Sequence, residues 1–78
     1  MVFEKLVSMA AEILEKDEED ITPETLLTKA AGVEALQLAK LVMECEGKFK
    51  IIIHDEEVHT FTCVKDLVIY IEKALSDV

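Results

Sequence analysis

The sequence predicts an all-α fold: a small bundle of three main helices near residues 3–15, 35–47 and 64–75, with a short additional helix near 55–60. Apolar residues recur at helical spacing in three separate segments. They make up 51% of the chain and aromatic residues only 5%, so aliphatic side chains must fill the core, which favours packed helices. Because 78 residues build only one hydrophobic core, residues 1–78 are expected to form a single domain.

The first predicted helix has one continuous apolar face. That face consists of Phe3, Leu6, Val7, Ala10, Ile13 and Leu14, and Glu4, Lys5, Ser8, Glu12 and Glu15 lie opposite. The acidic run 17–20 follows, and its like charges oppose the dipole of a helix C-terminus, so the helix is expected to end or fray there. These acids are consecutive and have no glycine turn among them, which favours a solvated loop over a calcium site.

A long connection separates the first two helices. Pro23 keeps its predecessor out of a helix, and Ile21, Leu26 and Leu27 are expected to turn inward and anchor the loop. Gly32 permits the tight turn before the second helix.

The second predicted helix carries Leu38, Leu41, Val42, Cys45 and Phe49 on one face. Gly47 costs about 1 kcal/mol relative to alanine in a helix interior, so the last turn is expected to be loose or absent. The apolar run 51–53 has no second strand-like run to pair with. We therefore expect it to be a loop that plugs the core.

Two further helices are predicted in the last third of the chain. The acids at 55–57 favour a short helix start. The final helix has Thr62 or Cys63 at its N-cap position and Asp66 in its first turn. Its apolar face comprises Val64, Leu67, Val68, Ile71, Ala74 and Leu75.

The net charge of −9 argues against nucleic acid and against an anionic membrane surface as partners, and a basic partner is its natural complement. The charge is uneven: residues 1–20 carry −5, residues 21–54 carry 0 and residues 55–78 carry −4. Cys45 and Cys63 lack metal-ligand spacing, and nothing resembles a signal peptide or a membrane span. A cytoplasmic, monomeric protein with free thiols and no membrane insertion is expected.

Five stretches in fixed order resemble the acyl carrier protein family and the related peptidyl carrier domains. Ile21-Thr22-Pro23-Glu24-Thr25 is similar to the start of the family's loop, and Gly32-Val33-Glu34-Ala35-Leu36 stands where the family has Gly-x-Asp-Ser-Leu. Leu41-Val42-Met43 with Phe49 continues the resemblance, and Ile53-His54-Asp55-Glu56-Glu57 is similar to Ile-Pro-Asp-Glu-Glu. Phe61 to Leu67, running on to Tyr70-Ile71, completes it.

The resemblance implies an attachment position for 4'-phosphopantetheine at Ala35. In the family, the serine of Asp-Ser-Leu carries this group, whose thiol holds the growing acyl or aminoacyl chain. Gly32, Glu34 and Leu36 flank the position, and Glu34 keeps the acid of the motif. Ala35 has no hydroxyl and cannot form the phosphodiester, so no cofactor is expected on a chain with this sequence. 4'-phosphopantetheine is expected only if residue 35 were serine.

The resemblance also implies a partner-recognition face on the second helix, where the family's partner enzymes look for acidic and apolar residues. The corresponding residues here, with Leu36, are Gln37, Ala39, Lys40, Met43, Glu44 and Glu46. Gln37 and Lys40 stand where acids are frequent, which weakens the acidic landing face. Alanine at position 35 has two explanations: the domain lost or never had the modification, or a natural serine was replaced. Two departures from the family's pattern in one helix favour the first explanation, divergence of the domain.

No enzyme activity is expected, because the chain has no nucleophile–base pair, no phosphate loop and no convincing metal site. The potential ligands His54, Asp55, Glu56, Glu57 and His59 match no defined zinc motif. Cys63, at a helix start, is interpreted as a small capping residue rather than a reactive thiol.

Three functions follow from the sequence. The leading hypothesis is an acyl-carrier-protein-like binding module that docks on basic surfaces of acyl-processing or assembly-line enzymes without carrying substrate. The first alternative is an ordinary acyl carrier protein of fatty acid or polyketide synthesis whose attachment serine is substituted by Ala35. The second alternative is a regulatory or structural subunit that self-associates through Met43, Ile52 and Ile69.

Overall fold

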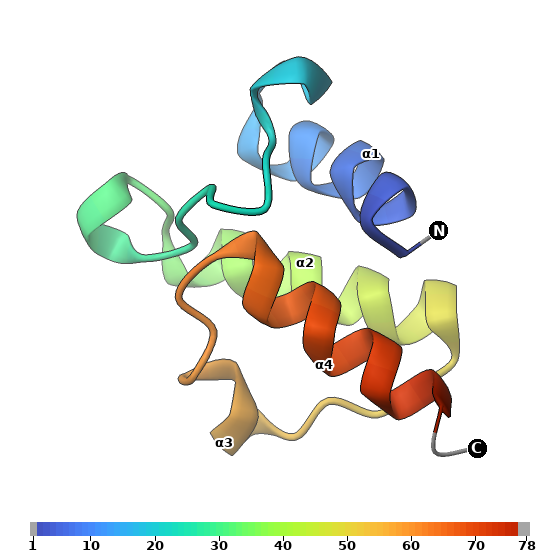
Figure 1. The fold of residues 1–78 in the computed structure, drawn as a ribbon. Helices are drawn as coiled ribbons and strands as arrows, with labels where there is room; N and C mark the ends of the chain where they lie inside the picture. The colour runs from blue at the N-terminus through green and yellow to red at the C-terminus, as the bar shows by residue number, and fades with distance from the viewer. Residues whose placement is uncertain (1, 77–78) are drawn as a thin grey trace.

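Helices make up the fold in the computed structural model, which describes residues 2–76 (Figure 1). The elements are α1 (Val2–Leu14), the short 3-10 helices η1 (Glu18–Asp20) and η2 (Lys29–Ala31), α2 (Ala35–Phe49), α3 (Asp55–Val58) and α4 (Val64–Ser76). Within these residues no strand forms, and an isolated antiparallel bridge joins Leu26 to Cys63. The prediction of three main helices and one short helix is confirmed.

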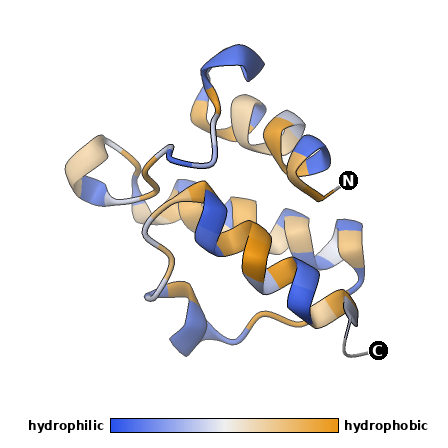
Figure 2. Cartoon of the chain, in the orientation of Figure 1, coloured by the Kyte–Doolittle hydropathy of each residue, from blue (hydrophilic) through white to orange (hydrophobic). Residues whose placement is uncertain are grey.

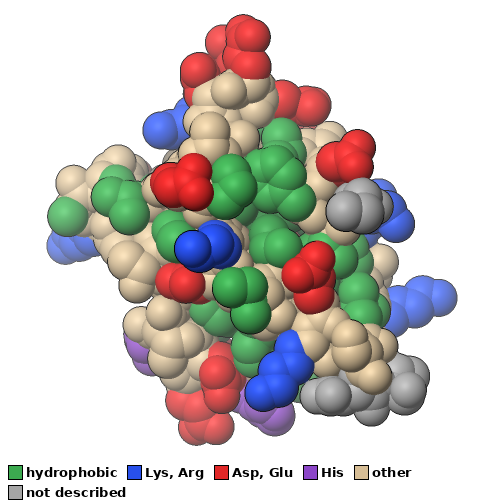
Figure 3. All heavy atoms as spheres, viewed as in Figure 1, with side chains coloured by type: hydrophobic (Ala, Val, Ile, Leu, Met, Phe, Trp, Pro, Cys, Tyr) green, Lys and Arg blue, Asp and Glu red, His purple; other side chains and the backbone are tan. Residues whose placement is uncertain are grey.

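The three long helices surround one core. α1 packs against both α2 and α4, while the short α3 lies at the opposite end of the molecule from η1 (Figure 1). Figure 2 shows that hydrophobic positions lie along the long helices, whereas η1 and the start of α3 are strongly hydrophilic. Acidic side chains accordingly project at these two ends, and the face that carries α4 mixes hydrophobic and charged side chains (Figure 3).

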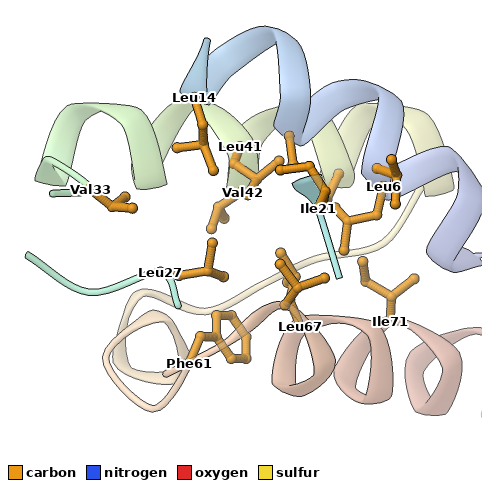
Figure 4. Close-up of a cluster of buried hydrophobic side chains, with 14 of the residues drawn as sticks. Leu6, Leu14, Ile21, Leu27, Val33, Leu41, Val42, Phe61, Leu67 and Ile71 are labelled. Atoms are coloured by element: carbon orange, nitrogen blue, oxygen red, sulfur yellow. The ribbon is translucent and has the colours of Figure 1, made fainter. Parts of the chain in front are cut away.

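Aliphatic side chains from every long helix and from the loop before α2 converge in the core (Figure 4). The largest fully buried side chains are Leu6, Leu27, Leu41, Leu67, Ile71, Val64 and Cys45. Burial of an aliphatic side chain stabilises the fold by about 1.5–3 kcal/mol relative to exposure, so the aliphatic side chains of this set contribute strongly to stability. No polar or charged side chain among residues 2–76 is buried. The interior is therefore an apolar scaffold without buried carboxylates, amines or imidazoles, and the thiol of Cys45 is the ionisable group that the described core contains.

α1 ends just before the acidic run, as predicted. Glu15 has a φ of 56°, in the left-handed region that commonly ends helices. The N–H of Lys16 donates to the carbonyl oxygen of Ala11 at 2.9 Å and closes the last turn. The run that follows forms the exposed η1.

The prediction that Gly47 loosens the end of α2 is wrong. The helix continues to Phe49 and ends at Lys50, which has a φ of 55° and whose N–H donates to the carbonyl oxygen of Glu46. Phe49 is half-buried against the core. Burial of this aromatic side chain outweighs the cost of about 1 kcal/mol that glycine adds to a helix.

The long loop docks on the start of α4. The N–H groups of Val64 and Lys65 donate to the carbonyl oxygens of Thr25 and Pro23 at 2.9 and 2.8 Å, which gives partners to the unpaired donors of a helix N-terminus. Asp66 Oδ2 accepts from the N–H groups at 62 and 63, at 2.9 and 3.3 Å. Cys63 thus occupies the predicted N-cap position, while the capping oxygen comes from Asp66.

Two extended segments each bury one apolar residue and expose its neighbour, and the prediction that Leu26 turns inward is wrong. Leu27 is buried as expected, but Leu26 is 49% exposed. Ile53 is buried as a plug, but Ile52 is 73% exposed. Neighbouring side chains of an extended chain point to opposite sides, so burial of one residue turns the previous one outward.

None of the helices within the described residues is long and apolar enough to cross a bilayer. Cys45 is buried and Cys63 is half-buried, and both are free thiols.

Candidate attachment and docking site

The turn before α2 positions the candidate attachment residue. Gly32 has a φ of 91°, which side-chain-bearing residues rarely adopt, and its N–H donates to the carbonyl oxygen of Lys29 at 2.9 Å. A Cβ added at Gly32 would meet nothing within 4 Å, so the requirement for glycine is conformational rather than steric. Val33 is buried, and its N–H donates to the carbonyl oxygen of Thr28 at 3.1 Å, which anchors the turn to the core.

The first turn of α2 is held by a capping box between Glu34 and Gln37. Gln37 Oε1 accepts from the N–H of Glu34 at 2.9 Å, and Gln37 Nε2 donates to the carbonyl oxygen of Ile13 at 3.4 Å. The second contact fixes the start of α2 against the end of α1. Gln37, predicted as a partner-recognition residue, is therefore half-buried and used in positioning the helix.

Ala35 is the first residue of α2 and is exposed. Its methyl group stands at a helix N-terminus, where unpaired N–H groups and the helix dipole favour an anion such as a phosphate. The position therefore has the setting that a phosphodiester requires, but no oxygen through which to form one.

A hollow of about 500 Å³ begins at Ala35 and runs between α2 and α3. It is lined by Ala35, Leu38, Ala39, Val42, Met43, Glu46, Ile53, Asp55, Val58 and His59. Most of these side chains are apolar, and the charged ones come from the C-terminal half of α2 and from the start of α3.

Glu46 holds the far wall of this hollow in place. Its Oε2 accepts from the N–H of Ile53 at 2.9 Å, and the residue is half-buried. Glu46, like Gln37, is a predicted partner-recognition residue, and in the structure each of these side chains also makes a hydrogen bond within the chain.

The remaining predicted recognition residues form an exposed face of α2. Leu36 and Met43 are 66% and 68% exposed, and Ala39, Lys40 and Glu44 are exposed as well. Leu36 and Met43 are seven residues apart, which places them about 10.5 Å from one another along one side of the helix. Two large apolar side chains without partners, next to a lysine, make a face that is apolar and close to neutral.

Nucleophilic chemistry has no support at this site. Burial, followed by the nearby charges of Glu44 and Glu46, raises the pKa of the Cys45 thiol to about 12, so this cysteine remains a protonated core residue. Within residues 2–76 no group of three or more His, Cys, Asp or Glu side chains could hold a metal ion.

The residues predicted for self-association do not share one hollow. Met43 lines the α2–α3 hollow, whereas Ile69 lines a shallower one with Phe61 and Tyr70, whose rings meet edge to face at 5.5 Å. Ile52 lies near α4, because the hydroxyl of Tyr70 donates to its carbonyl oxygen at 3.4 Å.

Sequence reasoning missed the roles of Gln37 and Glu46. An acid followed three residues later by glutamine at a helix start is a readable capping signal, so the bond between Glu34 and Gln37 could have been found. The contacts of Gln37 with Ile13 and of Glu46 with Ile53 had no local signal, because they join separate elements.

Comparison with known proteins agrees with this geometry. The family described as "Phosphopantetheine attachment site" matches residues 4–71. The acyl carrier protein of Onion yellows phytoplasma is 40% identical over 94% of this chain and 96% of its own length. That of Thermotoga maritima is 36% identical over 95% and 91%.

A solved structure extends the agreement to three dimensions. The crystal structure of an acyl carrier protein from Thermotoga maritima has a TM-score of 0.79 to this chain, with 34% identity, and the match covers 95% of this chain and 86% of that one. The chain therefore belongs to the acyl carrier protein family.

Proposed function

We propose that this chain is a carrier-protein-like module that docks on acyl-processing or assembly-line enzymes and does not itself carry 4'-phosphopantetheine. The observation that carries the proposal is the methyl group of Ala35 at the start of α2, in a chain that belongs to a family described by its phosphopantetheine attachment site. The Gly32 turn, the capping box and the hollow beside α3 are all present.

No serine hydroxyl among the described residues lies at the start of α2. The phosphodiester needs a hydroxyl at an exposed helix start, and Ser8 and Ser76 belong to α1 and to the end of α4. Thr28 precedes η2, on the far side of the Gly32 turn. None of these hydroxyls stands at the N-terminus of α2.

The exposed face of α2 is the docking surface that we propose for these enzymes. Leu36 and Met43 supply apolar contact area of the kind that marks protein–protein interfaces. The net charge of −9 attracts the chain to basic protein surfaces over long range. Close to Lys40 the face of α2 is nearly neutral, so its preference among partner enzymes differs from that of an acidic face.

A second candidate is an ordinary acyl carrier protein with a substituted serine. The exposed start of α2 at Ala35 and the hollow beside it favour this candidate, because an alanine-to-serine change would return the hydroxyl through which attachment occurs. The experiment that tests both proposals is incubation with a phosphopantetheinyl transferase and coenzyme A, read by intact mass. It is applied to the chain as written and to Ala35→Ser.

A further inference from the structure

The outer side of α4 points away from the core. Leu67 and Ile71 are fully buried, whereas Ile69, which lies between them in the chain, is 53% exposed. Because successive residues of a helix are about 100° apart, Ile69 leaves α4 on the side opposite these two core residues. We call this side the α4 face, and Figure 3 shows it as a mixture of hydrophobic and charged side chains. It consists of Lys65, Asp66, Ile69, Tyr70, Glu72 and Lys73.

Ile69 forms the apolar centre of the α4 face. A hollow of about 260 Å³ beside it is lined by Thr60, Phe61, Asp66, Ile69, Tyr70 and Lys73. The hydroxyl of Tyr70 donates to the carbonyl oxygen of Ile52 at 3.4 Å, which brings Ile52, 73% exposed, next to the same face. The rings of Phe61 and Tyr70 meet edge to face at 5.5 Å and support the hollow. Two large aliphatic side chains thus stand exposed on a surface that the chain itself holds in shape.

Four charged side chains surround Ile69 in two pairs. On one side lie Lys65 and Glu72, about 40° and 60° around the helix axis from Ile69. On the other side lie Asp66 and Lys73, at about 60° and 40°. One lysine and one acid stand toward each end of α4, all within about 6 Å of Ile69 along the axis. The α4 face is therefore electrically neutral, although the chain carries a net charge of −9.

This arrangement of charges is complementary to itself. In an antiparallel pair of α4 helices related by a two-fold axis at Ile69, each side of one helix meets the same side of the other with its ends exchanged. Lys65 then faces Glu72 of the second copy, and Asp66 faces Lys73 of the second copy. The symmetry repeats both contacts, so every charge near the axis meets an opposite charge. The positive end of each helix dipole also lies beside the negative end of the other.

We propose that the α4 face is a dimer interface, and that its occupant is the α4 face of a second copy of this chain. A dimer then takes the place of the monomer that the sequence led us to expect. α4 has 13 residues and is about 20 Å long. One pair of helices of this length buries less than the roughly 800 Å² per partner of a stable complex, so the dimer forms at high protein concentration and dissociates readily. The proposal goes beyond the proposed function, because the α4 face shares no residue with the docking face of α2.

Other occupants match the α4 face less well. A strongly acidic protein would oppose its two acids, and a strongly basic protein would oppose its two lysines. A nucleic acid or an anionic lipid surface would be repelled by the net charge of −9. The net charges of two copies also repel, but the acidic side chains project at the ends of the molecule that carry η1 and α3 (Figure 3). Physiological salt screens exposed charges that are more than about 8 Å apart.

The test is sedimentation equilibrium of the full chain from micromolar to millimolar concentration. A reducing buffer keeps both free cysteines as thiols, so a disulfide between copies does not contribute. The expected result is a reversible dimer with twice the 8.8 kDa mass of the chain. Circular dichroism confirms that each variant described below keeps its helices. A strict monomer at millimolar concentration would overturn the proposal.

Charge reversal tests the pairing itself. Glu72→Lys places two lysines opposite each other at both symmetry-related contacts and should weaken the dimer about tenfold or more. The same change lowers the magnitude of the net charge, so long-range repulsion alone predicts a tighter dimer. Lys65→Glu combined with Glu72→Lys restores opposite charges and should return the dissociation constant to within about twofold of the parent. A combined variant as weak as Glu72→Lys, or a Glu72→Lys dimer as tight as the parent, would contradict the pairing.

A matched pair of apolar substitutions tests the location of the interface. Ile69→Gln should weaken the dimer about tenfold or more, and Met43→Gln on α2 should weaken it by less than about twofold. Met43 is the more exposed of the two, at 68% against 53%, so exposure alone predicts the reverse order. Equal or greater weakening by Met43→Gln would place the contact on α2 and overturn the proposal. Because no enzyme or coenzyme takes part, these outcomes are separate from those that test the proposed function.

Discussion

Glu46 Oε2 accepts a hydrogen bond from the backbone N–H of Ile53 at 2.9 Å, and this contact joins α2 to the segment that leads into α3. α3 is four residues long, and it forms one wall of the hollow at Ala35. One side chain of α2 thus anchors the segment that leads into α3, the shortest α-helix of the described residues, beside the candidate site.

Glu46→Ala should lower the free energy of unfolding by about 1–3 kcal/mol, because it leaves the half-buried N–H of Ile53 without an acceptor. Amide hydrogen exchange at residues 55–58 should become faster. Urea unfolding and hydrogen exchange measure the two effects. Glu46→Gln keeps an acceptor oxygen and should lie close to the parent, so equal stability of Glu46→Ala and the parent would show that the contact contributes nothing.

The two glycines should respond to alanine in opposite directions. Gly32→Ala should destabilise the fold by about 1–2 kcal/mol, because residue 32 has a φ of 91°. Gly47→Ala should stabilise it by up to about 1 kcal/mol, because residue 47 is inside α2. An added Cβ meets nothing within 4 Å at either site, so the pair isolates the backbone effect. Thermal unfolding measures the stability change in each variant. A change in the same direction in both variants would contradict the backbone conformations assigned to the two glycines.

The two thiols should differ in reactivity. In the folded protein, an alkylating reagent should modify Cys63 and spare Cys45, which is fully buried and has a pKa raised to about 12. Both should react in urea. Mass spectrometry of the digested protein locates the label, and modification of Cys45 as fast as Cys63 under native conditions would contradict the described core.

Cys45 also implies a stability that depends on pH. Its folded pKa lies above the unfolded value of 9.0, so the folded state favours the neutral thiol. Its contribution is complete below pH 9.0 and is lost as the pH rises from there toward about 12. Cys45→Ala should flatten the alkaline fall in unfolding free energy relative to the parent. If the unfolding free energy of Cys45→Ala fell with rising pH as steeply as that of the parent, the loss of stability would come from other groups.

Lys40 should limit docking at the start of α2. In an Ala35→Ser background, Lys40→Glu should raise the initial rate of phosphopantetheine transfer several-fold, because a loading enzyme with a basic docking surface meets an acid in place of a lysine. Lys48→Glu makes the same change of charge elsewhere on α2 and should alter the rate less. Equal acceleration by the two variants would assign the effect to net charge rather than to this face.

The sequence predicted what depends on local periodicity. The helices, the end of α1 before the acidic run and the capping position at Cys63 follow from residues close together in the chain. The exposure of Leu26 could not be read in this way, because which side of an extended segment turns inward depends on the elements packed against it. The extension of α2 by two residues beyond the predicted end, to Phe49, depends likewise on the core.

At the site, the motif alone placed Ala35 at a helix start, and the structure agrees. The expectation that the chain is no enzyme is confirmed by its family, whose members are carrier proteins. The positioning contacts of Gln37 with Ile13 and of Glu46 with Ile53 span separate elements, so no pattern within the second helix revealed them.

Loading at residue 35 tests the central claim most directly. The chain as written and Ala35→Ser are incubated with a phosphopantetheinyl transferase and coenzyme A, and the intact mass of each is measured. The account predicts no mass change for the chain as written and the gain of one phosphopantetheine by Ala35→Ser, since the turn, the capping box and the hollow are in place. A gain of mass by the unaltered chain would contradict it.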